Sequence, residues 1–96
     1  MSIKFLLGQI VATPGALDAL EESHQKPGEF LKRHAAGDWG EVSSDDARLN
    51  NESLQDGSRI LSAYTTATGT RIWIITEAAD DDGLRTATTI LLPEEY

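Results

Sequence analysis

The chain has 96 residues, a formal net charge of −8, 40% hydrophobic residues and no cysteine. A chain of this size buries only about 60–65% of the surface that it exposes when unfolded, so residues 1–96 are expected to form a single domain. The acidity disfavours a broad basic surface for nucleic-acid phosphates, and the lack of cysteine excludes disulfides and thiolate metal ligands and favours the cytoplasm.

The first part of the chain is predicted to hold one strand and three helices. Residues 3–12 are rich in branched and large apolar side chains, which favours a strand. Thr13 before Pro14 indicates the start of a helix over about 14–24. A second short helix is expected from Pro27 to near Gly37, and a third from Ser43 or Ser44 to Gly57, with a long polar face.

The last part of the chain changes to a period of two, which indicates strands over 59–65, 71–77 and 84–92. The order β-α-α-α-β-β-β predicts an α+β fold, in which a mostly antiparallel four-stranded sheet carries the helices on one face. The strand over 71–77 is the most apolar and is expected to be central. The first strand is expected to join the other three, because alone it would leave an unpaired apolar edge.

Several stretches of the chain carry a resemblance to a known family. They are LLGQIVATPGAL (6–17), EFLKRH (29–34), GDWG (37–40), RILSAY (59–64), IWIITE (72–77) and TTILLPEEY (88–96). Together they resemble an uncharacterised family of short bacterial "plasmid-related" proteins, some of which are labelled type I restriction subunits. The resemblance implies mobile-element biology and gives no activity. Residues 78–84 depart from the family pattern, so the acidic loop in that segment is expected to be particular to this chain.

The layout of short helices followed by an antiparallel meander also describes ribonucleases of the barnase and RelE type. In that hypothesis a histidine acts as acid or base, arginines hold a phosphate, and tyrosine or threonine hydroxyls position it. The residues available for these roles are His34, Arg59, Tyr64, Arg71, Thr76, Arg85 and Thr88. The net charge of −8 opposes a polyanionic substrate. The hypothesis therefore requires His34, an arginine and Tyr64 to meet in one basic cleft.

The acidity itself gives the favoured hypothesis, which is a non-enzymatic protein that binds a protein partner. Residues 37–56 hold six carboxylates against Arg48 alone, and two further clusters follow, at 80–82 and at the C-terminal residues 94–96. A small rigid acidic surface can occupy a nucleic-acid channel of another protein, and electrostatic steering raises its association rate. The candidate partner-binding residues are Asp38, Trp39, Glu41, Asp45, Asp46, Glu52, Asp80, Asp81 and Asp82.

These acidic residues also have a simpler interpretation, because charged runs usually keep a protein solvated. Likewise, Trp39 either anchors a partner or plugs a corner of the core, and the plug is favoured. His34 near the end of its helix is more often structural than catalytic. The residue pattern predicts no metal site, no cofactor and no membrane span, and it leaves a homodimer through an exposed sheet edge open.

Overall fold

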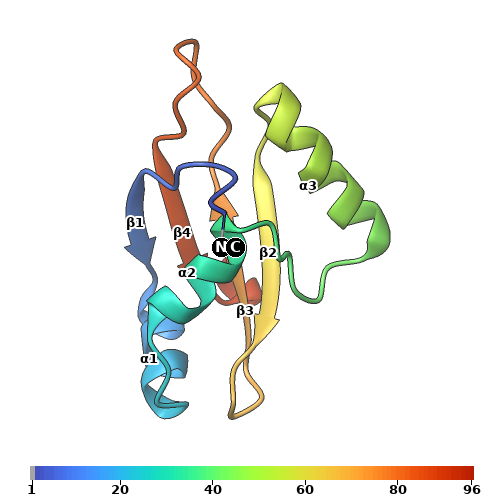
Figure 1. Cartoon of the computed structure of the whole chain (residues 1–96). Helices are drawn as coiled ribbons and strands as arrows, with labels where there is room; N and C mark the ends of the chain where they lie inside the picture. The colour runs from blue at the N-terminus through green and yellow to red at the C-terminus, as the bar shows by residue number, and fades with distance from the viewer. Residues whose placement is uncertain (1) are drawn as a thin grey trace.

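The fold is built on a four-stranded sheet with the strand order β1-β4-β3-β2 (Figure 1). The computed structural model describes residues 2–96. Its strands are β1 (Gln9–Ala12), β2 (Ile60–Thr65), β3 (Arg71–Thr76) and β4 (Ala87–Leu91). β3 pairs antiparallel with both β2 and β4, whereas β1 pairs parallel with β4. The α+β fold and the mostly antiparallel sheet are therefore confirmed, and the first strand does join the other three, as a parallel edge.

Three helices connect β1 to β2. They are α1 (Pro14–Glu22), α2 (Pro27–Ala35) and α3 (Ser44–Asp56). The Thr13 hydroxyl caps α1, the Ser43 hydroxyl caps α3, and Gly57 ends α3 at a φ of 81°. The predicted helix boundaries are thus close to the observed ones, because capping chemistry is local.

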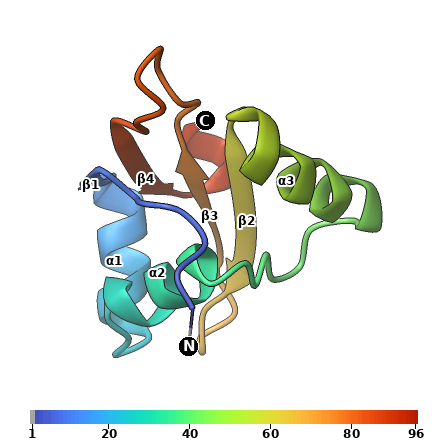
Figure 2. The same cartoon turned by 45° about the horizontal axis from the view of Figure 1, so that its top comes forward.

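The main core lies between one face of the sheet and the first two helices. Side chains of α1 and α2, including Leu20 and Phe30, pack against Tyr64, Ile72 and Ile90 of the sheet. The helix α3 differs, because it stands beside the β2 edge in both views (Figures 1 and 2). Its buried residues are polar, which suits a helix that meets the edge of a strand.

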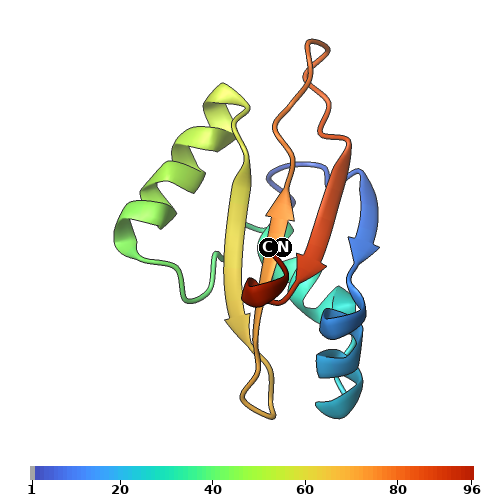
Figure 3. The ribbon, with the colours of Figure 1, turned by 180° about the vertical axis from the view of Figure 1, so that it is seen from behind.

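The C-terminal turn η1 (Pro93–Glu95) lies across the sheet face opposite α1 and α2 (Figure 3). Tyr96, which follows it, packs edge-on against Trp73 with ring centroids 5.8 Å apart. Glu95 reaches back to the start of α1, where it accepts hydrogen bonds from the Thr13 hydroxyl (2.5 Å) and the Gly15 amide (3.2 Å). These bonds, together with one from the Leu92 amide, lower the pKa of Glu95, and the first two join the C-terminal turn to the start of α1.

Two predicted strands are shorter than expected. β1 begins at Gln9 and not near residue 3, because Gly8 adopts a φ of 67° where its Cα lies against the backbone of Arg85 and Thr86. A side chain there would collide with that backbone, so glycine is required. β4 begins at Ala87 because the preceding residues form a hairpin that Asp80 stabilises.

Candidate interaction surface

Three of the residues proposed for catalysis, His34, Thr76 and Thr88, meet inside the core. His34 on α2 contacts Ser62 of β2 through Nδ1 (2.5 Å) and Thr76 of β3 through Nε2 (2.8 Å). The Thr76 hydroxyl contacts the Thr88 hydroxyl of β4 (2.7 Å), and Thr88 donates to the Leu7 carbonyl (2.7 Å). The result is one continuous chain of hydrogen bonds across the helix-facing side of the sheet.

The bond from Thr88 to Leu7 fixes the direction of the other bonds as far as His34 Nε2. Thr88 uses its single hydroxyl proton on the Leu7 carbonyl, so Thr76 must donate to Thr88. The Thr76 oxygen then accepts a hydrogen bond from His34 Nε2–H, and Nδ1 of the neutral ring accepts a hydrogen bond from the Ser62 hydroxyl. Because the buried ring is neutral, its single proton lies on Nε2. Burial, with a smaller contribution from the positive charge of Arg85, lowers its pKa to about 4.

The imidazole of His34 is closed off from solvent. Its side chain is 0% exposed. Phe5 packs against it edge-on, with ring centroids 5.2 Å apart, and Trp39 does so at 6.0 Å. A histidine enclosed in this way satisfies the polar groups of the core, and a substrate has no path to it.

The three arginines of the ribonuclease hypothesis hold unrelated contacts. Arg59 donates to the Tyr96 hydroxyl, on the sheet face that carries η1. Arg71 pairs with Glu41, with 3.2 Å between Nη1 and Oε1. The Arg85 guanidinium donates to backbone carbonyls, including that of Ser53 at the end of α3 (2.9 Å). Arg85 thus ties α3 to the hairpin before β4.

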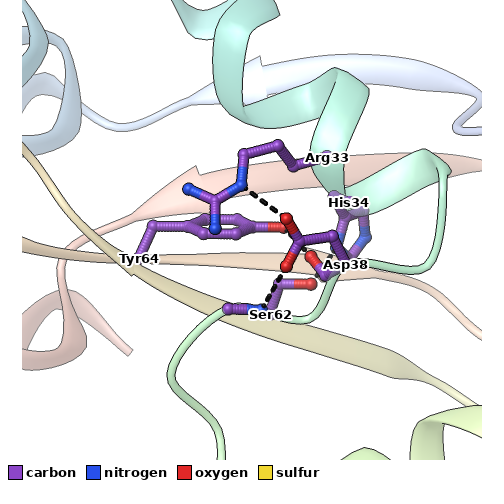
Figure 4. A network of polar contacts seen from close by, with 6 residues as sticks. Arg33, His34, Asp38, Ser62 and Tyr64 are labelled. Atoms are coloured by element: carbon purple, nitrogen blue, oxygen red, sulfur yellow. Dashed lines mark hydrogen bonds and ion pairs between the residues drawn. The ribbon is translucent and has the colours of Figure 1, made fainter.

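Tyr64 is likewise engaged within the fold. Its hydroxyl donates to the Asp38 carbonyl (2.5 Å), and the Arg33 guanidinium lies 4.5 Å from the centre of its ring (Figure 4). Burial raises the pKa of the phenol to about 12. His34, an arginine and Tyr64 therefore do not share an open cleft among the described residues, which is the geometry that a ribonuclease of this layout requires. Of the seven candidates, only His34, Thr76 and Thr88 meet.

The first three partner-binding candidates also have local roles. Asp38 pairs with Arg33 at 2.7 Å, which lowers the carboxyl pKa (Figure 4). Trp39 is 6% exposed and donates through Nε1 to Asn51 on α3 (3.1 Å), so it fills a corner of the core. Glu41 pairs with Arg71. These contacts hold the segment between α2 and α3 against the sheet.

The remaining candidates are exposed on α3 and on the hairpin before β4. Asp45 and Asp46 occupy the first turn of α3, where carboxylates favour the helix dipole. One oxygen of Asp80 accepts from the amides of Asp82 and Leu84, both at 2.9 Å, so this residue shapes the turn. Glu52, Asp81 and Asp82 also lie on the surface.

A groove lies beside this hairpin, between residues 3–8, the segment 79–86 and the end of α3. Its apolar lining includes Ile3 and Leu6, each 71% exposed, and Leu84, which is 57% exposed. The sequence pattern missed these residues because it placed residues 3–7 inside a paired strand. The signal that marks the break is Gly8.

Charged residues also line the groove. They are Lys4, Asp56, Asp80, Asp81 and Arg85. The Arg85 guanidinium is held by backbone carbonyls, whereas none of the ion pairs formed by residues 2–96 includes Asp56, Asp80 or Asp81. The groove therefore combines exposed apolar side chains with three carboxylates and two cationic side chains.

Comparison of the chain with protein-family models, curated proteins and solved structures gives no match. No helix within residues 2–96 has the length and apolar character needed to cross a membrane. In the same part of the chain, no group of three or more histidine or acidic side chains is placed to hold a metal ion. The groove beside the 79–86 hairpin is the candidate interaction surface.

Proposed function

We propose that the protein is a non-enzymatic binding protein that recognises a basic surface on another protein. The observation that carries the proposal is the groove, which joins exposed Ile3, Leu6 and Leu84 to the carboxylates of Asp56, Asp80 and Asp81. An apolar centre with charged surroundings is the common anatomy of a protein interface. Contiguous exposed apolar side chains on a folded protein often mark a site of interaction.

The carboxylates determine the charge of the partner that is attracted. Asp80, Asp81 and Asp82 form no ion pair among the described residues, and their charges attract a basic partner over about one Debye length, roughly 8–10 Å at physiological salt. This attraction raises the association rate more than it slows dissociation. The carboxylates at 80–82 lie on a hairpin that projects from the sheet (Figure 1), where solvent access is high and a partner meets them early.

The sequence resemblance to short bacterial plasmid-related proteins supports a partner encoded by the host or by a mobile element. A protein with a basic nucleic-acid channel has the required charge, and occupying that channel would inhibit a nucleic-acid-directed defence. The enclosed His34 and the separated arginines favour this binding function over the ribonuclease.

The proposal is tested by affinity purification from the native host, followed by kinetics with the recovered partner. The bait is the full chain, and the test variant carries Asp81→Asn and Asp82→Asn. The control variant carries Asp45→Asn and Asp46→Asn, two of the candidates from the sequence that the structure places outside the groove. It changes the net charge equally and lies roughly 17 Å along α3 from the end of the helix that lines the groove. We expect the test variant to associate about tenfold more slowly at low salt, with a weaker salt dependence, and the control to stay close to the parent. Equal effects of the two variants would contradict a localised binding surface.

A further inference from the structure

The two edges of the sheet are treated differently by the fold. At the β2 edge, the Asn50 side chain donates to the Leu61 carbonyl (2.7 Å) and accepts from the Leu61 amide (3.1 Å). Two residues further on, the Ala63 amide donates to the Trp39 carbonyl (3.1 Å) and the Ala63 carbonyl accepts from the Glu41 amide (2.7 Å). The chain thus closes this edge with its own groups.

The β1 edge is open. The amides of Gln9 and Thr13 donate to carbonyls of β4 or of the residue before it, each at 3.0 Å. In a parallel ladder alternate residues pair with the neighbouring strand, so the backbone groups of Ile10 and Ala12 point away from β4. Because β1 ends the strand order, no described segment covers them. Such an edge is a template for another strand.

Apolar side chains flank the open edge on both faces of the sheet. Ile10 is in register with Thr88 and shares the helix-facing side, where it lines the groove, while Val11 lies on the opposite face. Both side chains are 43% exposed. An added strand would therefore bury apolar surface on each face as well as pairing its backbone.

The charged residues around the β1 edge indicate which kind of strand would bind there. One end of β1 lies against the base of the hairpin that carries Asp80, Asp81 and Asp82. The other end leads into α1, whose exposed acidic residues are Asp18, Glu21 and Glu22 (Figures 1 and 3). A second copy would bring a net charge of −8 to a surface that is already acidic. The complementary occupant is a cationic one.

We infer that β1 accepts an extended partner segment that alternates basic and apolar residues and adds to the sheet as a fifth strand. Main-chain bonds to Ile10 and Ala12 provide affinity, and side chains on alternate faces provide specificity. This inference rests on the proposed function and names the chemistry of its partner segment.

The test uses a synthetic seven-residue peptide that alternates lysine with valine and is blocked at both ends. Two further peptides are N-methylated, one on every lysine and the other on every valine. In a strand the amides of alternate residues point to the same side, so only one of these sets faces β1. We expect that peptide to bind roughly tenfold or more weakly, because its edge-facing amides cannot donate, and the other to bind like the parent peptide.

The site of binding is located by amide hydrogen exchange of the isotope-labelled protein. The amides of Ile10 and Ala12 should exchange more slowly when the peptide is bound. The variant Ile10→Pro removes one of these outward amides, and proline is tolerated at an edge that faces solvent. We expect it to weaken binding about fivefold while the circular dichroism stays unchanged. If this variant fails to fold, the N-methylated peptides still decide the question.

The outcomes separate this inference from the proposed function. Equal binding of the two N-methylated peptides would overturn strand addition but leave charge-driven binding intact. A peptide with glutamate in place of lysine should not bind, and its binding would overturn the basic partner in both proposals. A dimer by light scattering, with Ile10 and Ala12 protected before peptide is added, would make the occupant a second copy and refute the inference.

Discussion

Acidification should destabilise the fold through His34, beginning near pH 6.5, which is above the range in which carboxylates ordinarily titrate. In the folded protein Nδ1 of His34 accepts a hydrogen bond from the Ser62 hydroxyl, and a protonated imidazole has no lone pair left for that bond. Protonation would also place a charge in a fully buried site. The folded state therefore keeps His34 neutral, whereas in the unfolded chain His34 is free to bind a proton.

The magnitude follows from the two pKa values of His34. Its ordinary value is 6.5 and its folded value is about 4, so folding releases a proton between these limits. Stability is fully present above pH 6.5 and is lost as the pH falls toward 4. At about 1.4 kcal/mol per pH unit, the loss between pH 7 and pH 5 is about 2 kcal/mol, and the complete loss is about 3 kcal/mol.

The assay is urea unfolding at pH 7 and pH 5, compared with the variant His34→Gln. Glutamine retains hydrogen-bonding groups but does not titrate, so its free energy of unfolding should change less between the two pH values. The control is His24→Asn, at an exposed position with a φ of 56° that asparagine accepts. This control should keep the full pH dependence. An imidazole resonance of His34 that titrates near pH 6.5 in the folded protein would refute the reasoning, whether or not the glutamine variant folds.

Two further perturbations test the closed β2 edge by thermal unfolding and light scattering. Gly40→Ala should lower the free energy of unfolding by several kcal/mol, because a Cβ there would collide with the Ala63 carbonyl. Gly69→Ala is the control, since Gly69 also has a positive φ but faces open space, and it should cost about 1 kcal/mol. Equal losses in the two variants would contradict the packing argument. Asn50→Ala should destabilise the fold by about 1–3 kcal/mol and promote association, because the backbone of Leu61 loses both partners. A monomeric variant of unchanged stability would show that Asn50 does not protect the edge.

The fold could be predicted because its signals are local. The alternation of Ile60, Ser62 and Tyr64 identifies one face of β2 without any knowledge of the helices. Caps such as Thr13 and Ser43 give helix boundaries from a few neighbouring residues. The parallel pairing of β1 with β4 could not be predicted in this way, because it depends on how the three helices between β1 and β2 are placed in space.

The meeting of His34 with the sheet could not be read from spacing, because its partners are 28 and 42 residues away. A weaker signal was present. The alternation of side chains along three strands places Ser62, Thr76 and Thr88, which are polar, on the core side of the sheet. Buried polar groups require partners, so three such positions together indicate a polar group on the covering helix. Only His34 satisfies all of the geometry.

The acidity divides into two kinds of carboxylate once the contacts are known. Asp38 and Glu41 are paired with arginines, and Glu95 caps α1, so these charges stabilise the fold. Asp81 and Asp82 have no such role among the described contacts, and they lie on the hairpin next to the open β1 edge. An exposed strand edge invites pairing between copies, and like charges at its ends oppose that pairing. The same charges attract a cationic strand, so one arrangement both restrains self-association and selects a partner.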